Sequence, residues 1–506
     1  MTVPMTEVQG IILRGYEDLK AARFVLLKIA DPVAARAWLA DLVQDQILTT
    51  AEIRPTSQAV NVAFTPAGLT RLGLPAECVD GFAREFLEGM DTDHRRRVLG
   101  DTEARSPNGW DWGNREDADN IHVLLMVYAD TPTNLENLFQ AQATRFQTAK
   151  LVEHSRGRFD PVFLKGRKEH FGFRDGIAQP FVEGVNKEPP RTEREKPVPE
   201  NTIPAGEFLL GYPNGYGEMP PSPKSSSDAN GEFDFGNNGS YLVIRQLSQD
   251  VRAFWTFLSK VSGPPGPNLP TDNAAVELAS RMVGRWPSGA PLAISPIKED
   301  PTKLDEDDFA YEKDPLGLQT PIGSHTRRSN PRDSLEPGPG GDGRLSTAES
   351  RKVTKLHRII RRGRPYGPPV VESMDPADIV RAIIAESPNL DDERGLLFLC
   401  FNANIARQFE FIQQTWINNP KFGGLYEDTD PLMGHRQPME MSRPADTFTQ
   451  QAEPVRRRFQ GLPDFVRVRG GGYFFMPGLR AIEYLSRLDA AATLAGASPG
   501  ANRSFD

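Results

Sequence analysis

The chain has few of the residues that build disulfide frameworks or local metal clusters. Its 506 residues include two cysteines, Cys78 and Cys400, and seven histidines, none of which pair at a metal-ligand spacing such as i,i+4. Two cysteines cannot supply a disulfide framework or a thiolate cluster, and the histidine spacing excludes a zinc site built from a local motif. The sequence contains neither a Gly-x-Ser-x-Gly nucleophile elbow nor a Walker loop, so it gives no support for a hydrolase of that type or a nucleotide-using enzyme.

The chain also lacks an excess of positive charge and a long apolar run. Asp and Glu outnumber Lys and Arg by 68 to 59, a formal charge of −9, which argues against a nucleic-acid-binding protein. No stretch approaches the roughly 20 apolar residues of a membrane-spanning helix. The first residues, 1–7, lack the basic and apolar regions of a signal peptide. We therefore expect a cytoplasmic protein that binds neither nucleic acid nor membranes.

The remaining composition is that of a packed globular protein. Apolar residues make up 38% of the chain and include 28 phenylalanines, and a chain of this length can bury a large core and form two or three domains. Apolar or alternating runs at 23–30, 59–64 and 122–129 predict strands. A helix start follows each of them: Asp31-Pro32, Thr65-Pro66 and a capping-box pattern at Thr133–Glu136.

The second part of the chain repeats this alternation of strands and helices. Strands are predicted at 208–212, 240–247, 357–363 and 395–401. Helices are predicted from 248, at 274–283, after Asp375-Pro376, and along the stripe Ile405, Phe409, Ile412 and Trp416. Because both halves alternate predicted strands and helices in a similar way, they indicate a duplicated α+β unit. The polar run 186–202 is typical of a linker, and the Gly/Pro-rich run 336–343 is typical of a loop.

One histidine stands in a setting that suits a metal-bearing cofactor. His325 lies in the polar, turn-rich run Pro321–Arg332, with Arg327, Arg328 and Arg332 close behind it. One neutral imidazole can hold haem iron because the porphyrin supplies four further ligands, and guanidinium groups suit propionate carboxylates. A solvated basic loop would contain the same residues, so the stretch decides nothing alone.

Two further charged residues occupy settings in which a side chain can face a cofactor. Asp175 precedes Gly176 in the aromatic, glycine-punctuated run Glu169–Pro180, and Arg361 ends a strand-like segment that Gly363 breaks. Taken singly, such an aspartate is more often a turn residue, and such an arginine more often lies on the surface. Only the combination with the histidine gives these residues a shared function.

These three stretches together resemble the motifs of the dye-decolorizing peroxidases. The family's Gly-x-x-Asp-Gly core matches 172–176, Ser324–Arg332 resembles its haem-ligand loop, and Ile359–Gly367 resembles the segment that carries its distal arginine. Other similar segments follow in the family's order between about residues 8 and 485. One motif would be weak, whereas the ordered set is specific, and the long second half looks most like the larger subclasses of the family.

The resemblance implies a duplicated ferredoxin-like α+β fold, in which each half is an antiparallel sheet with peripheral helices and the second half holds the haem. It implies a first domain at 1–200 and a haem-binding domain at 205–490, while the small and polar residues of 491–506 predict a disordered tail. The implied activity is the reduction of hydrogen peroxide with oxidation of bulky dyes, phenols or similar aromatic donors. We expect an acidic optimum, because an aspartate works at lower pH than a histidine base. A homo-oligomer is left open.

The resemblance also assigns the site residue by residue. It implies one haem b per chain, with His325 as the axial iron ligand, Asp175 as the distal acid–base residue and Arg361 as its partner. The remaining cofactor-binding residues that it implies are Gly176, Ile177, Ala178, Gln179, Arg332, Leu396 and Phe398.

One position departs from the family's pattern. Where many relatives carry an aspartate that hydrogen-bonds the proximal histidine, the register here gives Asn404, which cannot supply the same negative charge. Glu427, Asp428 and Asp430 are open as substitutes. Asn404 prompts one alternative, a haem-binding protein of weak turnover. Three others do not depend on it: a chlorite-decomposing haem protein, a deferrochelatase-type haem protein, and an α+β protein without a cofactor.

The size of the expected donors adds a hypothesis about electron transfer. Bulky dyes do not fit a pocket lined by Leu396 and Phe398, so we expect a tyrosine or tryptophan at the surface to relay the electron. Trp416, Tyr366 and Tyr426 are the candidates, although the apolar stripe that contains Trp416 favours a place in the core.

Overall fold

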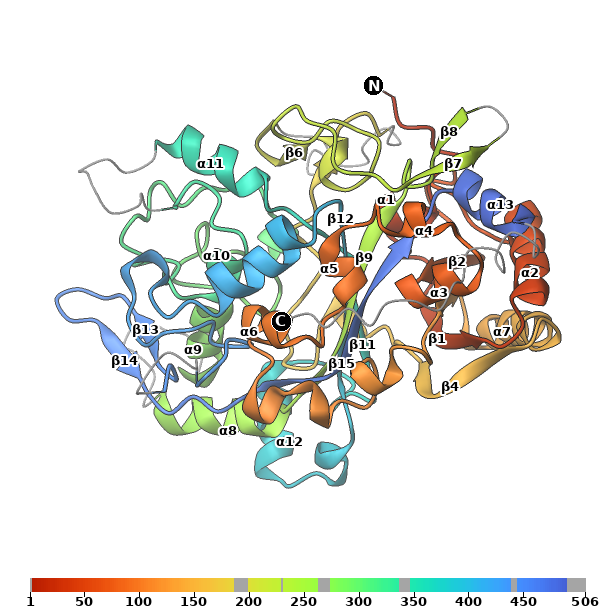
Figure 1. Cartoon of the computed structure of the whole chain (residues 1–506). Helices are drawn as coiled ribbons and strands as arrows, with labels where there is room; N and C mark the ends of the chain where they lie inside the picture. Colours follow the sequence, from red (N-terminus) through yellow and green to blue (C-terminus); the bar gives the residue numbers. More distant parts are fainter. Residues whose placement is uncertain are drawn as a thin grey trace.

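The computed structural model describes residues 2–185, 199–228, 231–262, 274–335, 346–437 and 444–488. The loop predicted at 336–343, the tail from 491 and most of the linker at 186–202 lie outside the described residues. Figure 1 shows the strands crossing the middle of the molecule, with helices on both sides. In the part of the chain that the structure describes, no helix combines the length and apolar character needed to cross a membrane.

The first half of the chain forms one four-stranded antiparallel unit. Its elements are β1 (Ala21–Ile29), α2 (Pro32–Asp45), β2 (Gln58–Phe64), β3 (Val123–Ala129), α7 (Pro132–Thr148) and β4 (Leu151–Phe159). The strands lie in the order β4-β1-β3-β2. This βαββαβ sequence with its split strand order is the ferredoxin-like arrangement.

The second half forms the same arrangement. Its strands are β9 (Ser240–Gln249), β10 (Ile360–Arg361), β11 (Arg364–Tyr366), β12 (Gly395–Asn402) and β15 (Val466–Met476). β10 and β11 both pair with β12, and the order continues β12-β9-β15. The predicted duplication of a ferredoxin-like α+β unit is therefore confirmed. Pairing of Phe475 in β15 with Phe64 in β2 joins both halves into one nine-stranded sheet.

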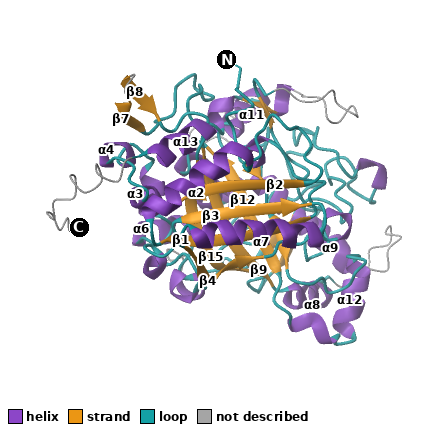
Figure 2. Cartoon of the chain, turned by 90° about the vertical axis from the view of Figure 1, so that its right-hand side faces the viewer, coloured by secondary structure: helices purple, strands orange, loops and turns teal. Residues whose placement is uncertain are grey.

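Helix starts follow the capping signals of the sequence. The Asp31 carboxylate accepts from the backbone of Val33 and Ala34 at the start of α2, and the Thr65 hydroxyl caps α3 (Pro66–Arg71). The start of α7 differs from the prediction, because Thr131 rather than Thr133 is its cap. The next residue, Pro132, suits the first helical position. Figure 2 shows α2 and α7 lying across the strands of the first half.

A separate helical layer packs against the second half. It consists of α8 (Val251–Val261), α9 (Ala274–Val283) and α12 (Pro376–Ile384). The buried face of α8 contains the predicted stripe Val251, Phe254, Trp255 and Leu258. These side chains belong to the same core cluster as Phe171 and Phe173, which flank Gly172 of the glycine-rich run. The layer therefore supports one wall of the candidate site.

Shorter elements complete the fold. The helices are α1 (Gly10–Leu13), α3 (Pro66–Arg71), α4 (Ala76–Val79), α5 (Arg84–Glu88), α6 (Asp93–Leu99), α10 (His325–Ser329), α11 (Thr347–Lys355) and α13 (Leu479–Arg487). The small strand pairs are β5 (Phe181–Val182) with β6 (Thr202–Ile203), β7 (Lys224–Asp228) with β8 (Gly231–Asp234), and β13 (Phe448–Gln450) with β14 (Arg457–Phe459).

Two sequence predictions in the second half were wrong in detail. The run 208–212 is a buried turn instead of a strand, because Gly211 takes a positive φ of 90° and the backbone N–H of Gly206 donates to the carbonyl of Pro213. Of the predicted strand 357–363, only Ile360–Arg361 pairs with β12. The stripe ending at Trp416 is helical, but it is wound as two wide π-type turns, at Ala406–Glu410 and Ile412–Ile417.

Candidate active site

His325 is the first residue of the short helix α10, and its ring lines a cavity of about 250 Å³. Its Nδ1 lies 2.8 Å from Oδ2 of Asp430, whose side chain is fully buried. A carboxylate partner fixes the tautomer in which Nδ1 carries the proton, so the lone pair of Nε2 is available to a metal. Among the described residues, no hydrogen bond occupies Nε2. The ring can therefore bind a metal through Nε2.

His325 and Asp430 each shift the pKa of the other. Burial disfavours the imidazolium, but the charge and hydrogen bond of Asp430 outweigh it and raise the pKa of His325. Burial likewise disfavours the Asp430 carboxylate, and His325 together with the backbone N–H of Met433 keeps its pKa below the usual value. Oδ1 of Asp430 accepts from the backbone of Leu432 (2.9 Å) and Met433 (3.0 Å), which fixes its orientation.

The structure corrects the expectation for Asn404. Its side chain accepts from the backbone N–H of Arg407 (2.9 Å) and acts as a local cap at the start of the wide helical turn, rather than as a partner of His325. Of the three acids left open, Asp430 makes the contact. The negative charge beside His325 is therefore present, and it comes from a loop 105 residues further along the chain.

Asp175 and Arg361 meet on another wall of the same cavity. The Arg361 guanidinium donates to Oδ1 of Asp175 (2.8 Å), and the backbone N–H of Gly176 donates to the same oxygen (2.6 Å). The side-chain amide oxygen of Gln179 accepts from the backbone N–H of Arg361 (3.1 Å), which ties the glycine-rich run to β10. Gly176 takes a positive φ of 79°, which a residue with a Cβ rarely adopts.

The charge balance keeps Asp175 ionised. Burial alone would raise the pKa of its carboxyl, but Arg361 and the backbone N–H of Gly176 more than offset it and lower the pKa. In return, Asp175 raises the pKa of Arg361. Both side chains keep about a third of their surface exposed, 36% for Asp175 and 30% for Arg361, so a small molecule in the cavity can reach the carboxylate.

Apolar side chains line the space between His325 and the Asp175–Arg361 pair. Leu396 and Phe398, two apart on β12, point into the cavity as expected, and Ile177 and Ala178 line it beside Asp175. Further apolar walls come from Phe171, Phe173, Leu247, Phe409, Ile412, Ile417, Leu432 and Met433. A largely apolar cavity with the His325 imidazole on one wall and an ion pair on another can hold a flat, mainly apolar group.

The arginines that follow His325 divide into two roles. Arg332 lines the cavity, where it bonds Asp307 and lies 3.9 Å from the centre of the Phe309 ring. Arg327 and Arg328, which the sequence left open as further propionate partners, do not line this cavity. Both are buried in the protein: Arg327 bonds Asp314 and Thr320, and Arg328 bonds the backbone carbonyls of Trp416, Asn419 and Asp428.

The cavity has polar groups that sequence reasoning missed. The guanidinium of Arg358 donates to Oδ1 of Asn201 (2.7 Å) but forms no ion pair with a carboxylate of the described residues. Burial lowers its pKa to about 10. The buried Nδ2 of Asn330 has no hydrogen-bond partner in the described chain. A haem would bring two carboxylates to such donors, so these groups fit that cofactor. Nothing in the local sequence distinguishes Arg358 from its basic neighbours.

A buried carboxyl, that of Glu169, also lines the cavity. Glu169 accepts hydrogen bonds from the backbone of Phe171 (2.9 Å) and Phe173 (3.0 Å) and from the Gln249 amide (2.5 Å). Burial outweighs these bonds and raises its pKa to about 7. These bonds hold the turn that presents Asp175 to the cavity.

The candidate relay residues lie in different environments. Trp416 is buried against Phe411 and His357, as its stripe predicted. Tyr366 is partly buried. Tyr426 is 68% exposed, with the Lys421 ammonium 5.8 Å from its ring centre. Of the three, Tyr426 is the residue whose side chain is mostly exposed at the surface.

Comparisons with known proteins show which family the chain is similar to. Residues 7–159 match the model of the DyP dimeric alpha+beta barrel domain. The chain is 30% identical over 517 residues to the dye-decolorizing peroxidase of Mycena epipterygia, an alignment that covers 95% of this chain and 86% of that protein. The chain belongs to the dye-decolorizing peroxidase family. It is also 29% identical over 500 residues to dye-decolorizing peroxidase msp1 of Mycetinis scorodonius, with 94% of this chain and 86% of that protein covered.

Solved structures of dye-decolorizing peroxidases have the same fold. An ancestral D-type dye-decolorizing peroxidase superposes with a TM-score of 0.72 at 28% identity, and the match covers 96% of this chain and 99% of that one. A variant of the enzyme from Auricularia auricula-judae gives a TM-score of 0.74 at 25% identity and covers 96% of this chain. The likeness therefore extends through both halves of the sheet.

Proposed function

We propose that this dye-decolorizing peroxidase is a haem-dependent enzyme that reduces hydrogen peroxide and oxidises phenols, dyes or similar aromatic donors. One observation carries the proposal. A single cavity holds His325, backed by a buried carboxylate, and an ionised Asp175–Arg361 pair on a different wall. That combination supplies an axial ligand, a proton acceptor and a positive charge within one apolar space.

One haem b is the cofactor proposed for this cavity. His325 would bind its iron through Nε2, Asp430 would orient the imidazole, and Arg332 and Arg358 would receive the propionates. Leu396 and Phe398 would cover the open face beside Asp175. Bound there, the haem supplies a redox-active iron at which peroxide is reduced.

The side chains around the cavity supply the proton chemistry. Asp175, held ionised by Arg361, can take a proton from one oxygen of hydrogen peroxide and return it to the other as the O–O bond breaks. Arg361 stabilises the negative charge that develops on the departing oxygen. A carboxylate with a lowered pKa stays basic in mild acid, so the expected optimum lies at acidic pH.

The contact between Asp430 and His325 weakens one alternative. A haem-binding protein of weak turnover was considered because Asn404 cannot orient the proximal histidine through a negative charge. Asp430 provides that charge instead.

The test is peroxide-dependent oxidation by the purified, haem-loaded protein. We expect turnover of a phenol and of a bulky dye with hydrogen peroxide, and loss of most of it in Asp175→Ala. Chlorite decomposition or release of iron from haem, in the absence of peroxide-dependent oxidation, would favour the other haem functions and contradict this proposal.

A further inference from the structure

A second cavity opens on the surface near the candidate active site. It has a volume of about 570 Å³ and lies between segment 160–165, which follows β4, and segment 367–374, which precedes α12. This volume lies within the range of small-molecule sites. We call it the surface pocket.

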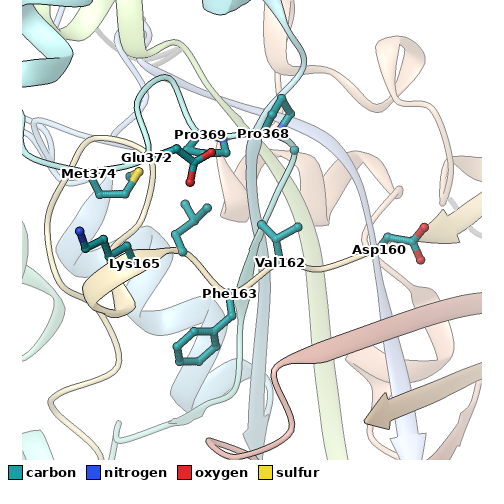
Figure 3. Close-up of a pocket in the computed structure, with 10 residues that line it drawn as sticks. Asp160, Val162, Phe163, Lys165, Pro368, Pro369, Glu372 and Met374 are labelled. Atoms are coloured by element: carbon teal, nitrogen blue, oxygen red, sulfur yellow. The ribbon is translucent and has the colours of Figure 1, made fainter. Parts of the chain in front are cut away.

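The lining of the surface pocket combines apolar side chains with three charged ones, Asp160, Lys165 and Glu372. The apolar residues are Val162, Phe163, Leu164, Pro368, Pro369 and Met374. Glu372 is exposed and makes no hydrogen bond or ion pair with any described residue, whereas Asp160 is bound by Arg23 at 2.6 Å. Figure 3 shows Glu372 with Pro368 and Pro369 on the side opposite Val162. An apolar lining beside the exposed Glu372 carboxylate suits an aromatic ring that carries an O–H or N–H group.

The surface pocket adjoins the space around the distal ion pair. Val162, Phe163 and Leu164 also line an inner cavity of about 140 Å³ that reaches Asp175 and Arg361. In Figure 3, the side chains of Val162 and Phe163 point to opposite sides of their segment. One three-residue stretch therefore borders both the surface pocket and the inner cavity.

Hydrogen bonds connect the walls of the surface pocket to the segments that carry the distal pair. The backbone N–H of Val162 donates to the carbonyl of Pro365 (2.8 Å), four residues after Arg361. The Lys168 ammonium, three residues after the first wall, donates to the carbonyl of Met374 in the second wall (3.0 Å). The pocket is consequently formed before a ligand arrives, and it is fixed relative to the distal residues.

We propose that the surface pocket binds small aromatic donors that carry a phenolic hydroxyl or an amino group. The inference rests on the proposed peroxidase function, because it assigns that reaction a donor site. Two donor molecules each lose one electron and one proton, and hydrogen peroxide takes up both electrons and both protons to give two molecules of water. The ring would pack on Val162, Pro368 and Pro369, and its O–H or N–H would donate to Glu372.

The first experiment measures binding without turnover. Phenol is titrated against the haem-loaded protein in the absence of peroxide, and its binding is followed by saturation-transfer NMR. Val162→Phe places a ring inside the pocket, and Val152→Phe adds the same bulk at a 55%-exposed position of β4 outside it. We expect Val162→Phe to weaken phenol binding more than tenfold and Val152→Phe to leave it unchanged. Equal binding by both variants would overturn the proposal.

The second experiment tests the carboxylate, and it stands even if Val162→Phe fails to fold. Glu372→Ala is compared with Glu218→Ala, which removes an exposed glutamate outside the pocket. We expect Glu372→Ala to weaken phenol binding about 3- to 10-fold, the value of one hydrogen bond to a carboxylate at a surface, and to leave anisole binding unchanged because anisole has no O–H. An equal effect on both ligands, or none on phenol, would overturn the assignment.

Turnover separates this inference from the function on which it rests. In Glu372→Ala, the KM for phenol should rise about 3- to 10-fold while the KM for hydrogen peroxide and the rate with a bulky dye stay constant, because Glu372 lines the surface pocket and neither of the cavities that contain Asp175. A parallel loss with all three substrates would mark a structural defect and contradict the donor site. If the wild-type protein oxidised no donor with peroxide, the proposed function would fail, whatever the binding experiments showed.

Discussion

Replacing Asp430 by asparagine should weaken haem binding without changing the shape of the loop. Asp430 accepts three hydrogen bonds, from Nδ1 of His325 and from the backbone of Leu432 and Met433. An asparagine can keep the backbone bonds through Oδ1, but its Nδ2 donates where the carboxylate accepted. His325 must then either lose its partner or take the tautomer that carries the proton on Nε2, the nitrogen needed by iron.

The magnitude follows from the burial of this contact. Groups that orient a metal-bound histidine are typically worth about 10- to 100-fold in metal affinity or activity, or roughly 1.4–2.8 kcal/mol. The Asp430 side chain has 0% exposure. Water therefore cannot replace the lost acceptor, and we expect an effect at the upper end of that range.

The assay is the rate at which haem transfers from the protein to excess apomyoglobin, followed by its absorption. Asp428→Asn is the matched control, because Asp428 is buried two residues away and bonds the backbone of Thr449 rather than His325. We expect haem to leave Asp430→Asn about 100-fold faster than the wild type, with a much smaller change in the control. Equal rates in the two variants would refute the reasoning.

Three further predictions concern the distal side and the cofactor. Asp175→Asn should lower kcat/KM for hydrogen peroxide by about 10²- to 10⁴-fold, the usual value of a general acid–base residue; a rate near wild type in stopped-flow measurements would exclude that role. Arg361→Leu should move the acid limb of the pH–rate profile to higher pH, because Arg361 lowers the pKa of Asp175 and burial alone raises it, so the carboxylate would protonate earlier as the pH falls; an unmoved limb would contradict the pairing. Arg358→Ala should speed haem loss, whereas Arg327→Ala should mainly lower Tm, because Arg327 is buried against Asp314 instead of the cavity; the reverse pattern would contradict the division of roles.

The parts of the fold that the sequence predicted correctly depend on local chemistry. Asp31 and Thr65 were recognised as helix caps because a cap needs only a side-chain oxygen and the next few backbone N–H groups. The strand at 122–129 was recognised because its buried residues are consecutive in the chain. The run 208–212 was wrongly predicted as a strand, because its buried residues are also consecutive in the chain. Burial by itself does not distinguish a strand from a buried turn.

The parts of the site that were missed depend on contacts between distant segments. Asp430 could be proposed only as one of three acids, because its distance to His325 is set by the folding of a loop 105 residues away. Asn404 was assigned to the wrong position because a register taken from relatives was carried onto a segment that caps its own helical turn. Arg327 and Arg328 resemble Arg332 in sequence, and only the packing of α10 separates buried structural arginines from the one that lines the cavity.

The most direct test of the account is the visible absorption spectrum of the purified protein, recorded beside that of His325→Ala. The account predicts a Soret band with one haem per chain in the wild type, and a weakened or displaced band with loss of bound haem in the variant. A wild-type protein that binds no haem when it is supplied, or a His325→Ala protein with an unchanged spectrum and haem content, would contradict the assignment of His325 as the axial ligand.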